Sequence, residues 1–215
     1  MSFLLFVPVV LISLSLHELA HGYAAYKMGD PTARNFGRLT LNPAKHLDPI
    51  GTVCMLIFGF GWAKPVPVNT RCFRNPRKGM AVTAVAGPLA NLALSFVFTF
   101  LYHLFFKLLG GMVVSSNMVY YTIMAFLSFL SMMAYSNAIL CVFNLIPIPP
   151  LDGSRILSLL LPAKWSYAVM QYERYIMIGF LALVFVLSRM GISLVSYPAD
   201  GLVWLFDSLF SAIGL

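Results

Sequence analysis

Residues 3–26 of the chain, FLLFVPVVLISLSLHELAHGYAAY, decide the class of protein. This stretch is longer than the roughly 20 apolar residues that an α-helix needs to cross the hydrocarbon core of a bilayer. Its three ionisable residues all fall within His17-Glu18-Leu19-Ala20-His21. Because ionisable side chains are costly inside a membrane and usually functional there, the stretch predicts a membrane span that carries a chemical site.

The composition of the whole chain agrees with a membrane protein. Of its 215 residues, 60% are hydrophobic and 10% are charged, against roughly 25% charged residues in an ordinary soluble domain. A soluble domain cannot bury so much apolar surface, and the mean hydropathy of +0.86 excludes intrinsic disorder. The composition therefore predicts a polytopic protein surrounded by the lipid bilayer.

Further apolar stretches follow the first one at 80–106, 118–146, 175–190 and 194–215. The stretch at 175–190 is short for a span, so we expect about five transmembrane helices, within a range of four to six. The apolar part of segment 50–69 is too short to cross and predicts a re-entrant segment or a β-hairpin. The expected fold is a single all-α transmembrane domain over 1–215.

The basic residues are placed on one side of these spans. Nine of the 14 Lys and Arg residues lie between the first and second spans, and three lie between the third and fourth. The positive-inside rule places these loops in the cytoplasm and the N-terminus outside. The net charge of +7 is therefore a topology signal, and no nucleic-acid partner is expected.

The H-E-x-x-H pattern at His17–His21 predicts a zinc site. Residues four apart lie on one face of a helix, one turn from each other, so both imidazoles can bind the same Zn²⁺. Glu18 then lies beside the metal, where a carboxylate can accept and return a proton. At 1.5 Å per residue His21 is ~8 Å from the cytoplasmic end of its span, which places the site in the cytoplasmic part of the bilayer.

A catalytic zinc needs a third protein ligand and an open position for water. Asp152 is one candidate, because it follows the third span in a proline-rich turn on the cytoplasmic side. Asp48, in His46-Leu47-Asp48-Pro49, is the rival. Alternatively, each of the two aspartates could only stabilise the turn in which it lies, by a hydrogen bond to the local backbone.

The segment Gly87-Pro88-Leu89-Ala90-Asn91 lies near the cytoplasmic start of the second span. Gly87 and Asn91 share a helix face, and small residues permit close approach of helices. We interpret this face as a packing seam, with Asn91 bonding between helices and the metal site packed against it.

Together these motifs resemble the site-2 protease family of intramembrane zinc metalloproteases. The resemblance rests on the H-E-x-x-H, on the Gly87–Asn91 segment and on three further stretches: 37–52 (GRLTLNPAKHLDPIGT), 61–69 (GWAKPVPVN) and 144–153 (NLIPIPPLDG). No part of the chain resembles the PDZ or CBS domains of larger members. The resemblance therefore indicates a short prokaryotic form, and the placement of Lys and Arg predicts that its active site in the cell membrane lies toward the cytoplasm.

The resemblance implies a role for each site residue. It implies one Zn²⁺ per chain bound by His17, His21 and Asp152, with Glu18 as the general base for a zinc-activated water and Asn144 as a polar partner of the reacting carbonyl. The expected substrates are transmembrane segments of other proteins, cut at peptide bonds that must first unwind. A non-proteolytic metal-binding scaffold and a transporter remain as alternatives, and no oligomeric state is predicted.

The prolines in segment 50–69 bear on how such a substrate is held. In a strand, Pro65 and Pro67 remove two amide donors from one edge, while Val66 and its neighbours keep theirs on the other. The intact edge either adds an unwound substrate as an extra strand or is already used within the protein.

Overall fold

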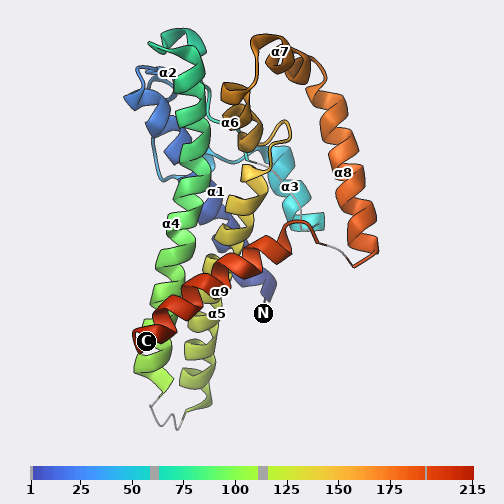
Figure 1. Ribbon diagram of the computed structural model, residues 1–215. Coiled ribbons are helices and arrows are strands. Elements are labelled where there is room, and N and C mark those ends of the chain that lie inside the picture. Colours follow the sequence, from blue (N-terminus) through green and yellow to red (C-terminus); the bar gives the residue numbers. More distant parts are fainter. Residues whose placement is uncertain (1, 59–62, 111–115, 192) are drawn as a thin grey trace.

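The computed structural model describes residues 2–58, 63–110, 116–191 and 193–215, and their regular structure is helical. Three long helices form the centre of the molecule (Figure 1): α1 (Ser2–Lys27), α4 (Pro76–Gly110) and α5 (Asn117–Leu145). All three are long and apolar enough to cross a membrane. They cover the stretches expected to be spans at 3–26, 80–106 and 118–146, and the bounds of the spans stay a prediction.

Two further helices occupy the other expected spans. They are α8 (Glu173–Arg189) and α9 (Ser196–Ala212), of 17 residues each. In Figure 1, α9 crosses over α4 and α5, whereas α8 stands to one side of the three long helices. Phe180 of α8 packs on Phe143 of α5, with 6.2 Å between the ring centroids. Whether α8 and α9 cross the membrane stays a prediction.

Short helices and loops gather at one end of the long helices (Figure 1): α2 (Thr32–Asn35), α6 (Asp152–Leu160) and α7 (Ala163–Gln171). The remaining elements before α4 are the 3₁₀ turns η1 (Pro43–Lys45) and η2 (Thr70–Cys72) and helix α3 (Pro49–Phe58). Within the described residues, the segment expected to be re-entrant or β begins with α3 and has one antiparallel bridge, between Leu47 and Ala63. Residues 59–62 of that segment lie outside the described residues, and the hairpin stays a prediction.

The buried face of α1 explains how the centre packs. Val9, Ser13, His17, His21 and Ala25 are all buried and recur every fourth residue, which places them along one side of the helix. The buried residues of α4 that face the neighbouring helices are mostly small or hydroxylated, as expected where helix backbones approach closely within a membrane. Gly87 packs against the imidazoles of α1, as predicted for the seam, whereas Asn91, which was expected to bond between helices, has no side-chain hydrogen-bond partner among the described residues.

Candidate metal centre

The two histidines of α1 and the first residue of α6 converge at the cytoplasm-facing end predicted from the charges. Nε2 of His17 and Nε2 of His21 are 2.9 Å apart, and Oδ2 of Asp152 lies 3.3 Å and 3.1 Å from them. Both imidazoles are buried, and the carboxylate is half-buried. Among the described residues, this is the group of His, Cys, Asp and Glu side chains that could hold a metal ion.

The turn between α5 and α6 carries Asp152 to this position. Prolines at 147, 149 and 150 prevent the α5 helix from continuing, and α6 begins at Asp152. Gly153 is essential to the turn, because a Cβ on this residue would lie 2.3 Å from the carbonyl oxygen of Leu145. The backbone can therefore fold closely against the end of α5 only with glycine at this position.

Gly87 of α4 gives the two imidazoles their space. A Cβ on Gly87 would lie 2.4 Å from Nε2 of His21 and 2.6 Å from Cε1 of His17. These distances are far below van der Waals contact, so any larger residue would displace both rings.

The geometry and chemistry of these three groups fit zinc. Tetrahedral zinc with ligands at about 2.0–2.2 Å separates its donor atoms by about 3.3–3.6 Å. The distance of 3.3 Å between His17 and Asp152 lies in this range, and the other two, 3.1 Å and 2.9 Å, are shorter than it. Nδ1 of His21 donates to the carbonyl oxygen of Thr83 at 2.8 Å, which fixes the ring with Nε2 toward the site, where this atom can bind a metal once it has lost its proton. Burial alone would raise the pKa of Asp152, but the adjacent imidazoles hold it at about 2, so the carboxylate is ionised.

Glu18 lies beside this group, on the next position of α1. Its Oε2 accepts a hydrogen bond from the backbone amide of Val66 at 2.9 Å. The amide of Lys64 donates to the carbonyl oxygen of His46 at 2.8 Å. The sequence left open whether the amides of the edge around Val66 bind a substrate or other parts of the protein. The structure shows that the amides of Lys64 and Val66 bind within the protein.

Arg38 holds the chain around Val66 in place. Its buried guanidinium donates to the carbonyl oxygens of Lys45 and Lys64, and to that of Pro65 at 3.2 Å. Sequence reasoning missed this role. The only signal was that Arg38 belongs to the stretch 37–52 of the family resemblance, since its acceptors are backbone atoms.

The two remaining candidates lie in different places. Asn144 lines the same cavity of about 570 Å³ as His17 and Glu18, and its Nδ2 donates to the carbonyl oxygen of Leu140 at 3.0 Å. Asp48 is not part of the group of possible metal ligands. Its Oδ1 accepts from the amide of Gly51 at 2.8 Å and so caps the start of α3.

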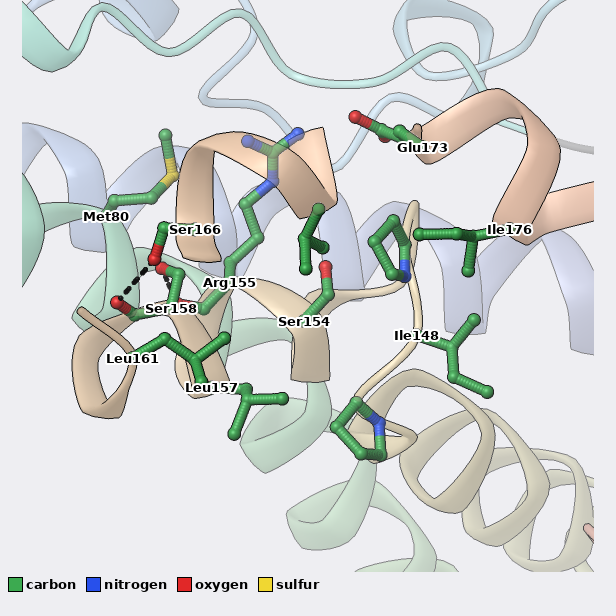
Figure 2. Close-up of a pocket in the computed structure, with 13 residues that line it drawn as sticks. Met80, Ile148, Ser154, Arg155, Leu157, Ser158, Leu161, Ser166, Glu173 and Ile176 are labelled. Carbon is green, nitrogen blue, oxygen red and sulfur yellow. Dashed lines mark hydrogen bonds between the residues drawn. The ribbon is translucent and has the colours of Figure 1, made fainter. Parts of the chain in front are cut away.

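A second, smaller cavity of about 170 Å³ adjoins the first (Figure 2), and Met80, Arg155 and Glu173 line both. Figure 2 shows that its wall comes from the turn before α6, from α6 and α7, and from the start of α8, with the side chains of Ile148, Leu157 and Ile176 around it. Its lining is mainly apolar. The metal site therefore opens beside an apolar recess.

Comparison with known proteins identifies the family of this chain. Residues 5–187 match peptidase family M50. The chain belongs to this family. It is therefore a zinc metalloprotease of the membrane, as the sequence motifs predict.

The relatives of this M50 chain carry matching names. It is 42% identical over 212 residues to "Putative zinc metalloprotease YwhC" of Bacillus subtilis (strain 168), covering 96% of this chain and 93% of the relative. It is 30% identical over 211 residues to "Putative zinc metalloprotease Rip2" of Mycolicibacterium smegmatis, covering 95% of this chain and 74% of the relative. No solved structure matches the chain significantly.

Proposed function

We propose that this M50 chain hydrolyses peptide bonds in or near transmembrane segments of membrane proteins, at a single zinc held by His17, His21 and Asp152. The observation that carries the proposal is the convergence of these three donor atoms beside Glu18 on the wall of one cavity. The adjoining apolar recess supports an apolar substrate segment. The clustering of Lys and Arg in alternate loops supports a site in the cell membrane that faces the cytoplasm.

Zinc and the residues around it have different roles in amide hydrolysis. Zinc, when bound, supplies a Lewis acid that polarises the scissile carbonyl and acidifies water. Glu18 takes a proton from the attacking water and passes it to the leaving amine. The amide of Val66 donates to Oε2 of Glu18 and so orients the carboxylate for this role.

Asn144 stabilises the negative charge that develops on the carbonyl oxygen. Its amide group lies on the cavity wall and now donates to Leu140, its own helix neighbour. A rotation of the side chain exchanges this bond for one to the substrate, where a preorganised donor lowers the barrier.

The roles are tested with purified protein in detergent, by zinc content and by cleavage of a model transmembrane substrate. We expect Glu18→Gln to keep its zinc and to lose activity by about 10²–10⁴-fold, because only the proton carrier is removed. His17→Ala, His21→Ala and Asp152→Ala should each lower zinc content. Asp48→Ala serves as the matched control and should keep zinc.

Two outcomes would contradict the proposal. Zinc loss in Asp48→Ala together with full zinc in Asp152→Ala would change the third ligand. Undiminished cleavage by Glu18→Gln would remove the carboxylate from the reaction, whereas a wild-type protein that binds zinc but cuts no transmembrane substrate would favour the metal-binding scaffold.

A further inference from the structure

The two imidazoles at the metal centre differ in what holds them. Nδ1 of His21 has a partner, the carbonyl oxygen of Thr83. Nδ1 of His17 is buried and, among the described residues, has no hydrogen-bond partner. Histidines that bind metal almost always donate the hydrogen of their other nitrogen to an acceptor, which fixes the orientation of the ring. His17 therefore needs an acceptor that the ligand set does not supply.

Asn91 of α4 is a second buried group with unmet hydrogen-bonding capacity. Its side chain is fully buried, and neither Oδ1 nor Nδ2 has a partner within the described part of the chain. An amide with no partner in a low-dielectric interior costs about 1–3 kcal/mol. Such a residue is expensive in a membrane helix unless it has a function.

Helix geometry brings these two groups to the same place. Asn91 is one turn beyond Gly87 on the same face of α4, and the space above Gly87 is filled by the rings of His17 and His21. Side chains on a helix lean toward its N-terminus, so Asn91 leans back over Gly87. Because α1 runs antiparallel to α4 (Figure 1), His17 leans in the opposite direction, toward the level of Asn91.

We infer that Asn91 is a positioning residue of the metal centre: in the zinc-loaded protein its side chain turns so that Oδ1 accepts a hydrogen bond from Nδ1–H of His17, a bond that these two unpartnered atoms do not make in this structure, and so fixes this ring for zinc. Asn91 thereby does for His17 what the carbonyl oxygen of Thr83 does for His21. This inference rests on the proposed ligand set. It assigns to Asn91 a role in metal affinity beyond that of a residue packed in the seam.

The test compares zinc affinity with the stability of the metal-free protein. Asn91→Leu keeps the size of the side chain and removes its polar atoms. We expect zinc affinity, measured by chelator competition, to fall by about 10- to 100-fold. We expect the unfolding temperature of the metal-free variant to be unchanged or higher, because an unpartnered buried amide has been removed. A purely structural role would instead lower this temperature.

Asn137 of α5 provides a matched control. It is also fully buried in the centre, but its Nδ2 donates to Oγ of Ser13 at 2.9 Å and to the carbonyl oxygen of Met133 at 2.7 Å. Asn137→Leu should lower the unfolding temperature and leave zinc affinity unchanged. Asn91→Asp, which keeps an acceptor oxygen, should restore affinity to within about threefold of the wild type.

A spectroscopic measurement reports on His17 itself. In the zinc-loaded protein, the ¹⁵N and ¹H signals of its Nδ1–H group should shift upfield in Asn91→Leu and not in Asn137→Leu. Wild-type zinc affinity in a folded Asn91→Leu protein would overturn the inference, as would a loss of affinity only in Asn137→Leu. A wild-type protein that binds no zinc would instead overturn the ligand set of the proposed function.

Discussion

At the scale of single residues, the centre depends on close contacts that permit no side chain larger than hydrogen. Gly87 faces both imidazoles from the neighbouring helix. We expect Gly87→Ala to push the two rings apart and to lower zinc affinity by at least about tenfold, because ligand orientation sets metal affinity. Chelator competition measures this effect.

Gly110, at the end of the same helix, is the control for Gly87. A Cβ on Gly110 would have no neighbour within 4 Å among the described residues. Gly110→Ala should bind zinc as the wild type does. Equal zinc affinity in Gly87→Ala and Gly110→Ala would contradict the conclusion that Gly87 leaves the space that the two imidazoles need.

Asp30 makes the fold sensitive to acid. This residue is fully buried just after α1 and accepts hydrogen bonds from the backbone amides of Asn69 at 2.6 Å and Thr32 at 2.9 Å. Burial alone would raise the pKa of Asp30, but the bonds from Thr32 and Asn69 lower it below its usual value. The ionised carboxylate therefore ties the end of α1 to the segment that carries Val66.

The lowered pKa of Asp30 sets the sign of the pH dependence. Its contribution to stability is complete above the unfolded pKa of about 3.9 and is lost as the pH falls through the lower folded value. Asp30→Asn should therefore cost about 1.5–3 kcal/mol near neutral pH, and the difference from wild type should shrink below about pH 4. Unfolding in detergent at several pH values measures this, and a difference that grew on acidification would contradict it.

The ligands themselves show what a sequence can predict at this scale. The spacing of His17 and His21 is sufficient to place two imidazoles together, because helix periodicity is known before the fold. The residues alone left Asp152 and Asp48 as rivals, and the family resemblance implied Asp152; that Asp152 lies next to both imidazoles is visible only in the fold. The partner of His21 could not be predicted, because the carbonyl of Thr83 is a backbone atom that any residue would supply.

At the scale of elements, the segment after α3 is held by one side chain. The guanidinium of Arg38 binds three backbone carbonyls at fixed positions, which a lysine cannot match because it is a point charge on a flexible stem. We expect Arg38→Lys to release Val66 from Glu18 and to lower kcat/KM by about tenfold with zinc content retained. Zinc analysis and cleavage assays measure both.

Arg34 offers a comparison for Arg38. It is exposed, and its guanidinium donates to the hydroxyl of Tyr26 at 2.8 Å on the surface. Arg34→Lys should cleave the substrate at the wild-type rate. If Arg38→Lys also retained full activity while amide exchange near Val66 increased, the link from Arg38 to Glu18 would not exist.

The elements differ in how far sequence reasoning could predict them. The long apolar stretches predicted α1, α4 and α5 because a span must satisfy its backbone hydrogen bonds internally. The described part of the interval 28–75 consists of short helices, 3₁₀ turns and loops, and its conformation depends on contacts between residues distant in sequence, such as that of Arg38 with Pro65. Periodicity carries no information about such contacts, so the packing of this interval was not predicted.

At the scale of the whole molecule, both basic loops lie at one end. Arg77, just inside α4, donates to the carbonyl oxygen of Leu161 at 3.3 Å, while the last residues of α4 and the first residues of α5 lie at the opposite end (Figure 1). Single cysteines at positions 74 and 164 should therefore be labelled only from the cytoplasm, and one at position 116 only from outside. The labelling uses membrane-impermeant reagents on cells and inverted vesicles, in a protein whose own cysteines are replaced. Labelling of position 74 from outside would invert the topology.

The distance along the chain between the proposed ligands has a consequence for biosynthesis. His17 and His21 enter the membrane with the first helix, whereas Asp152 is made only after α4 and α5. A nascent chain that still lacks α6 holds two of the three ligands and has no complete site for the metal. With the proposed ligand set, the ribosome finishes most of the transmembrane core before the metal site can be complete, so we expect no cleavage of membrane proteins by the incomplete chain.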